Sequence, residues 1–259
     1  MKSPQAVLAA TGLLLLLAAA ANADLTQVDN PWPTQPGGSG EWNLYDTGSG
    51  NKGIMEYLYG PGHFTRVDDA ADQLWQDGHG TTTAQAKFAG YDQNLYWDDG
   101  RTLHFLFSQE ATVNPLWDGG PSVSFDIGKG VTVRWVDDTT ASGGVWVSSD
   151  PSKTLYQGQP LINEDHMVTF LVTGRNVYDS ADPYEPLYWE EFTDGRPHYV
   201  IAFEDLPFFD PQCRNPWSDK DYQDLVVEVT TVHPIPAPAA IGLGMLGLGL
   251  IGWYMRRFA

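Results

Sequence analysis

Short runs of β-forming residues, separated by glycine- and aspartate-containing turns, recur along most of this 259-residue chain. No stretch among them keeps a helical period for three turns, although 68–75 could form a short helix. The pattern predicts an all-β fold, an antiparallel β-sandwich or jelly roll built as a single domain. The expected strands lie at 55–59, 81–88, 95–97, 103–107, 122–127, 131–136, 144–147, 166–173, 200–203 and 225–232.

The first 23 residues have the pattern of a cleaved export signal. Lys2 supplies a positive start, an apolar run follows, and Ala21 and Ala23 place small side chains where a signal peptidase cuts. We therefore expect signal peptidase as a partner, cleavage after Ala23, and export of the body through the inner membrane.

The last 26 residues, 234–259, combine three features. Pro234, Pro236 and Pro238 come first, seventeen uncharged residues follow, and Arg256 and Arg257 close the segment. A helix of that length spans roughly 26 Å, enough for a thin bilayer, and the arginine pair would remain on the cytoplasmic side. The segment therefore predicts a transmembrane helix that leaves the body facing the periplasm.

This C-terminal arrangement resembles the PEP-CTERM sorting tails of Gram-negative bacteria, with Ile235 where the prototype has glutamate. The resemblance implies processing by an exosortase, transient insertion in the inner membrane, and delivery to the cell surface or exopolysaccharide matrix. The alternative is a permanent inner-membrane anchor. Together the ends divide the chain into a signal (1–23), an irregular or β segment (24–80), a β-sandwich core (81–233) and a sorting tail (234–259).

The charge balance excludes one class of partner and points to another. Lys and Arg number 14 against 33 Asp and Glu, a formal net charge of −19. Nucleic-acid binding needs a basic face to neutralise phosphates, so we expect no nucleic-acid partner. Such an acidic body outside the cytoplasm needs screening by cations, for which calcium is the obvious candidate. The single cysteine excludes an intrachain disulfide framework.

Five carboxylates cluster around two neighbouring predicted strands near the end of the body. Carboxylates crowded in this way repel one another, and a calcium ion, which takes six to eight oxygen ligands, would reverse that cost. The spacing is not that of an EF-hand, because Asp224 and Thr230 stand at its sixth and twelfth positions. The alternative is a solvated acidic turn. The candidate calcium ligands are Glu204, Asp205, Asp219, Asp221 and Asp224.

The same stretch resembles the closing signature of an uncharacterised bacterial domain family, whose members are often exported with PEP-CTERM tails. Phe203-Glu204-Asp205-Leu206 followed by D-K-D-Y-Q-D at 219–224 carries the resemblance, and 87–96 and 163–167 resemble its earlier segments. The resemblance implies a β-rich module with a calcium-linked acidic site and no established catalysis. His166 either lies beside that site or is simply hydrogen-bonded at the start of a strand, the interpretation we favour.

The sequence as a whole predicts an exported surface or matrix protein with a calcium-stabilised body that acts in binding or structure and is not an enzyme. The alternative is a polysaccharide-acting hydrolase or lyase, or a lectin-like module that binds extracellular polysaccharide. Hydrolysis would need two carboxyl groups flanking a cleft, and 98–99, 190–191 and 204–205 offer adjacent pairs. Tryptophans could supply a platform for sugar rings, although core packing is the expected role of each one.

Overall fold

The computed structural model describes residues 27–29, 42–45, 52–114, 120–161, 164–179, 181–208, 218 and 220–235. The expected signal, with Ala21 and Ala23, lies outside these residues, as do Pro236, Pro238, Arg256 and Arg257 of the expected tail. Within the described ranges, no helix combines the length and the apolar character that crossing a membrane requires.

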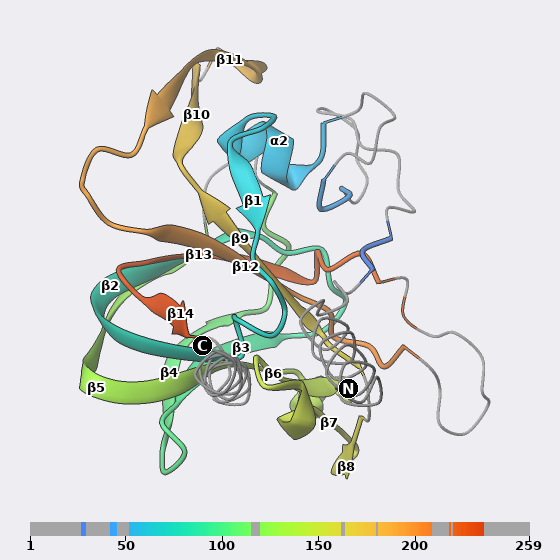
Figure 1. The fold of residues 1–259 in the computed structure, drawn as a ribbon. Coiled ribbons are helices and arrows are strands. Elements are labelled where there is room, and N and C mark those ends of the chain that lie inside the picture. Colours follow the sequence, from blue (N-terminus) through green and yellow to red (C-terminus); the bar gives the residue numbers. More distant parts are fainter. Residues whose placement is uncertain are drawn as a thin grey trace, which may run out of the picture.

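The described body is mostly antiparallel β-structure, which confirms the antiparallel β class that the sequence predicts. Twelve strands belong to one strongly curled sheet that forms a half-barrel (Figure 1). Its main path runs β1 (Phe64–Arg66), β9 (Met167–Val172), β12 (His198–Phe203), β13 (Leu225–Thr230), β2 (Leu74–Ala86), β5 (Ser122–Asp138), β6 (Val145–Ser148), β7 (Leu155–Tyr156) and β8 (Gln159–Pro160). Beside this path, β14 (His233–Ile235) pairs with β2, and β3 (Gln93–Asp98) joins β4 (Leu103–Gln109) to β5.

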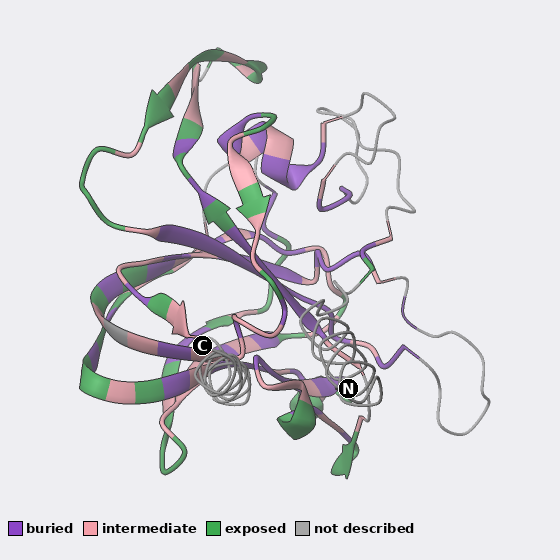
Figure 2. Ribbon diagram, viewed as in Figure 1, coloured by how far each residue is buried: buried purple, intermediate pink, exposed green. Residues whose placement is uncertain are grey.

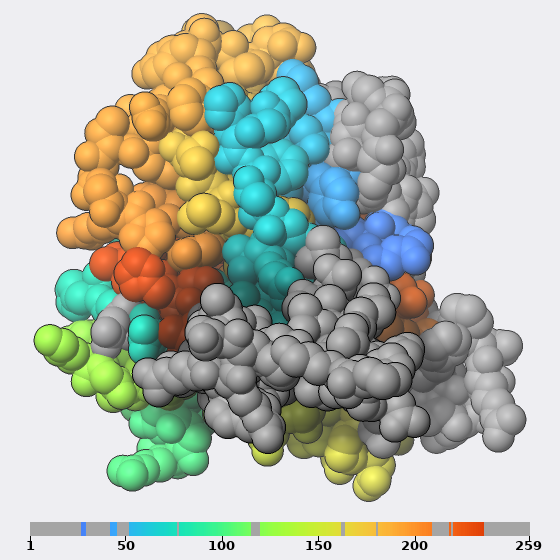
Figure 3. All heavy atoms as spheres, viewed as in Figure 1, coloured from blue at the N-terminus to red at the C-terminus, as the bar shows by residue number. Residues whose placement is uncertain are grey.

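The remaining elements are small. A separate hairpin of β10 (Gly174–Asp179) and β11 (Asp182–Glu191) projects at the upper edge of the face in Figure 3. The helix α2 (Ile54–Tyr59) packs near β10, and two short 3-10 turns, η1 (Thr140–Ser142) and η2 (Pro151–Lys153), flank β6.

The long strand β5 joins the two halves of the sheet. Its first part pairs with β2, and its last part pairs with β3 on one side and β6 on the other. The sequence predicted two strands here, divided at Gly128, but the structure has one strand with a large bulge. Residues 128–131 lie between the paired Ile127 and Thr132, whereas β2 has one residue in the corresponding interval. Glycine in a strand interior favours such a bulge, because it removes the side chain that would resist bending.

Hydrophobic cores lie on both faces of the central strands. In β12 every residue is buried (Figure 2). Tyr199, Ile201 and Phe203 point into the core enclosed by the curled sheet, which we call the inner core. Val200 and Ala202 point into a second core, the outer core, which α2 and residues 42–45 cover. The expected irregular segment 24–80 therefore contributes buried side chains as well as the start of β2.

Three local predictions are wrong. The segment 55–59 is helical: Glu56 accepts a hydrogen bond from the Gly53 amide at the helix start, and Met55, Tyr57 and Tyr59 are buried. Residues 68–75 form an Asp68-centred turn that leads into β2. The strand pairing also continues through Pro234 and Ile235, opposite Trp75 and Leu74. Proline is tolerated in β14 because an edge strand has amides that need no partner.

Replacement of Ile201 by alanine should lower the free energy of unfolding by about 2–5 kcal/mol, because the site is enclosed on the inner core. Leu187→Ala is the matched control, since Leu187 is 61% exposed on β11 and should change stability by about 0.5 kcal/mol or less. Urea denaturation measures both values. Equal effects of the two substitutions would contradict the assignment of the inner core.

Candidate metal centre

The ends of neighbouring strands bring the acidic residues to one rim of the half-barrel. Phe203, at the end of β12, lies opposite Leu225 at the start of β13 and opposite Met167 at the start of β9. The residues next along the chain, Glu204, Asp224 and His166, must therefore be close in space. Antiparallel register alone thus joins segments that are about twenty and forty residues apart.

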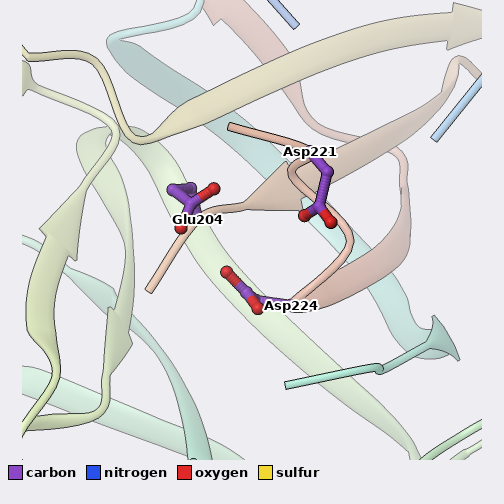
Figure 4. A group of neighbouring side chains, drawn as sticks. All are labelled: Glu204, Asp221 and Asp224. Carbon is purple, nitrogen blue, oxygen red and sulfur yellow. The ribbon is translucent and has the colours of Figure 1, made fainter. Parts of the chain in front are cut away.

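Glu204, Asp221 and Asp224 form a carboxylate triad at this rim. One oxygen from each lies within 4.8 Å of the others, and Figure 4 shows the three carboxylates facing a common space. Glu204 and Asp221 are buried. Calcium–oxygen distances of about 2.3–2.6 Å place ligand oxygens on opposite sides of one ion about 5 Å apart. This buried triad could therefore hold a metal ion.

Each carboxylate of the triad is oriented by an N–H group. The Asp205 backbone amide donates to Oδ2 of Asp224 at 2.7 Å. The Gln223 side-chain amide donates to Oδ2 of Asp221 at 2.5 Å, and the Leu206 backbone amide donates to Oε1 of Glu204 at 3.2 Å. Outer hydrogen bonds of this kind fix the direction of ligand side chains before an ion arrives.

The loop that carries Asp221 has an unusual backbone. Lys220 (φ 56°) and Tyr222 (φ 54°), on either side of Asp221, both adopt the left-handed conformation without being glycine. This conformation costs each residue about 1–2 kcal/mol. Burial of the Tyr222 ring offsets part of the cost, and its hydroxyl donates to the Asp165 carbonyl at 2.6 Å.

Residues near the N-terminus hold the same loop from the outside. The Asp29 amide donates to the Lys220 carbonyl at 2.9 Å, and the Trp42 amide donates to Oε1 of Gln223 at 3.1 Å. Gln223 therefore connects the Trp42 backbone to the Asp221 carboxylate. This connection links the position of a ligand to a segment about 180 residues away in the sequence.

Of the five predicted ligands, the structure brings three into the triad. Asp205 is buried next to them, but its Oδ2 accepts a hydrogen bond from the Gln93 side-chain amide at 2.6 Å. Asp219 lies outside the described residues. Gln93 and Gln223 were not predicted, because their parts in the site depend on contacts across the sheet and not on spacing in the chain.

His166 satisfies both interpretations that the sequence left open. It is fully buried just before β9, and its Nε2 lies 2.9 Å from Oε2 of Glu164. Its Nδ1 lies 3.1 Å from the carbonyl oxygen of Glu204, and its ring stacks on Phe208. His166 therefore helps to position the backbone of a triad residue without being a member of the triad.

Crowding of negative charge dominates the electrostatics of the triad. Burial raises the pKa of Asp224 well above its usual range, and Asp205, Glu204 and Asp221 raise it further. A cation at the triad would stabilise the ionised carboxylates and reverse these effects.

The structure places the other acidic residues and the tryptophans in a turn, on the exposed hairpin and in the cores. Asp99 accepts hydrogen bonds from the amides of its own turn, and Glu190 pairs with Arg175 on the exposed hairpin. Trp42, Trp75 and Trp135 are fully buried in the cores, and Trp97 stacks on His104. The packing of these tryptophans is the role that the sequence favoured for them.

Comparison with protein-family models and with curated proteins finds no match to this chain.

A second buried acidic group, Asp72, lies near Asp165 and Asp69. Asp72 is almost fully buried, and Arg66 pairs with Asp69 at 3.0 Å nearby. Burial raises the pKa of Asp72 well above its usual range, and Asp165 raises it further. The folded chain therefore binds a proton at Asp72 more tightly than the unfolded chain does.

Replacement of Asp72 by asparagine should flatten the dependence of stability on pH. Because the folded-state pKa is raised, the stability contributed by the protonated Asp72 is fully present below the ordinary value of 3.8 and is lost as pH rises through the folded-state pKa. The free energy of unfolding of the parent chain should therefore fall between pH 5 and pH 8, by up to about 1.4 kcal/mol per pH unit for this proton. The free energy of unfolding of the Asp72→Asn variant should fall less steeply over the same pH range.

Urea denaturation at pH 5 and pH 8, with the calcium concentration held constant, measures the difference. Glu185→Gln is the control, because the Glu185 side chain is 77% exposed and should leave the slope unchanged. A slope for Asp72→Asn equal to that of the parent would contradict this prediction.

Proposed function

We propose that this chain is an exported cell-surface or exopolysaccharide-matrix protein, with a calcium-stabilised β body that acts in binding or structure rather than in catalysis. The observation that carries the proposal is the triad of Glu204, Asp221 and Asp224, whose carboxylate oxygens lie within 4.8 Å of one another and are held in place by amide groups. Carboxylates packed this closely away from water are stable only when their charge is neutralised.

Calcium is the metal that suits these ligands best. All the donor atoms are hard carboxylate oxygens, whereas zinc sites usually include histidine or cysteine. Magnesium demands near-ideal octahedral geometry, while calcium tolerates irregular sets of six to eight oxygens. Calcium would join the end of β12 to the 221–224 loop, and through Gln223 it would also fix the covering segment at Trp42.

The shape of the body supports a binding or structural role. The inner core collects side chains from β9, β12 and β13 and from β3, β4 and β6, so the two halves of the curled sheet face each other as the layers of a sandwich-like fold would. Extracellular polysaccharide is the partner we propose, because Phe105, Tyr184 and Tyr188 expose aromatic rings that could pack on sugars.

The location is proposed from the two ends of the sequence. The signal pattern at 1–23 supports export with removal by signal peptidase. The tail supports transient insertion in the inner membrane and processing by an exosortase, or else retention as a periplasm-facing anchor. The net charge of −19 agrees with a body that works where calcium is plentiful.

Removal of calcium with EDTA should lower the melting temperature of the chain by roughly 5–10 °C, because an ion that binds only the folded state contributes about 2–4 kcal/mol. Asp221→Asn should remove most of this difference, since it takes one charge from the triad while keeping the shape of the side chain. Differential scanning calorimetry with and without calcium measures the effect.

Asp126→Asn is the control for this experiment. Asp126 lies on β5 with 73% of its side chain exposed, so the response to EDTA should persist in that variant. A melting temperature of the parent chain that ignores EDTA would count against the metal.

Truncation after Ile235 should change where the protein is found while leaving its melting temperature unchanged. Truncation after Val232 should also destabilise the body, because it removes the pairing of β14 with β2. Fractionation of cells that contain an exosortase, combined with calorimetry, tests both truncated chains. An unaltered location after the first truncation would refute the sorting role of the tail.

A further inference from the structure

Asp137 lies at the same rim as the triad, in the interior of the half-barrel. Its Cα pairs with Leu95 of β3 and with Val147 of β6. Alternation along β5 gives Asp137 the same face as Val133 and Trp135, which belong to the inner core. Its carboxylate therefore points inward, just before β5 ends.

Asp205 is fixed next to Asp137 by the turn between β5 and β6. The Asp205 carbonyl accepts a hydrogen bond from the Val145 amide at 3.0 Å, two residues before the Val147 that faces Asp137. Gly144 permits this approach, because an added Cβ would meet the Thr139 side chain and the Asp205 carbonyl. Asp205 also holds the triad, since its own amide donates to Asp224.

Buried polar atoms at this place lack partners. Asp137 is fully buried, and within the described part of the chain neither of its carboxylate oxygens has a hydrogen bond of standard geometry, although the nearby Asn94 amide partly stabilises its charge. Gln93 is also fully buried. Its Nε2 donates to Oδ2 of Asp205, and its Oε1 accepts no hydrogen bond from the described residues. Buried oxygens of this kind are costly unless a donor or a cation satisfies them.

Five carboxylates of the described residues gather at this rim. The carboxylates there are Asp137, Glu204, Asp205, Asp221 and Asp224. Lys87 is the one buried lysine or arginine among the described residues. Its ammonium donates to the carbonyls of Ala89 (2.9 Å) and Glu110 (3.2 Å) rather than to a carboxylate. Acidic groups crowded in this way are an arrangement that divalent cations stabilise.

We propose that Asp137, Asp205 and the amide oxygen of Gln93 form a second divalent-cation subsite beside the triad, so that the rim holds a pair of calcium ions. The inference rests on the proposed function of the triad and extends it. Two carboxylates and an amide carbonyl are hard oxygen donors of the kind that calcium takes. Asp205 couples the two subsites, because its carboxylate serves the second ion while its backbone amide orients Asp224 for the first.

Calcium stoichiometry tests this inference. The full chain is stripped with chelator, titrated with calcium chloride by isothermal calorimetry at pH 7, and its bound calcium is counted by elemental analysis after gel filtration. We expect two ions per chain for the parent and one for Asp137→Asn. Asp138→Asn is the matched control and should keep two, because it removes the same charge one residue along, where the carboxylate instead caps Thr140.

Gln93→Met is a second variant, in case Asp137→Asn does not fold. It removes the amide oxygen but not a charge, and it should weaken the second binding event by about tenfold or more while leaving the first intact. One bound ion in the parent would overturn the second subsite and leave the proposed function standing. This is the result to expect if a proton, and not a second ion, neutralises Asp137. Two ions in Asp137→Asn would also overturn the assignment. No bound calcium in the parent would refute both proposals.

Discussion

Mutual repulsion among carboxylates shielded from water is the constraint around which the rim of this half-barrel is arranged. Glu204, Asp221 and Asp224 face one another within ligand distance, and Asp205 lies directly behind them. Amide groups hold each member in place, and Lys87, the one buried lysine among the described residues, donates to backbone carbonyls. Such a group is stable only with cations or protons, so the chemistry of this rim depends on which of them it binds.

The fold supplies the stiffness that keeps these charges together. β12 is buried on both faces, and its end therefore cannot move away when Glu204 is repelled. The left-handed residues that flank Asp221 are retained because Tyr222 is buried and because backbone groups near the N-terminus bond to the loop. The covering segment, the helix α2 and the central strands thus share one outer core, which ties the stability of the body to the geometry of the site.

Most strands could be predicted from the sequence, because alternation and turn residues report on a half-buried sheet. The helix α2 could not, since Met55-Glu56-Tyr57-Leu58-Tyr59 satisfies the two periods equally well over five residues and only packing against the outer core decides between them. In the candidate site, too, some residues could be predicted from the sequence and others could not. Glu204, Asp221 and Asp224 were predictable from their places beside two adjoining strands, whereas the hydrogen bond from Gln93 to Asp205 depends on a contact across 112 residues.

The sequence by itself determined the antiparallel β class, the acidic character of the body and the three carboxylates of the triad, because these follow from local pattern and composition. Tertiary structure alone decided that β5 is one strand shared by both halves of the sheet, that the Asp205 carboxylate accepts a hydrogen bond from Gln93, and that Asp137 joins the same rim. The physical reason is that register between distant strands sets which side chains meet, and this register is fixed by burial of whole sheet faces rather than by the neighbours of any one residue.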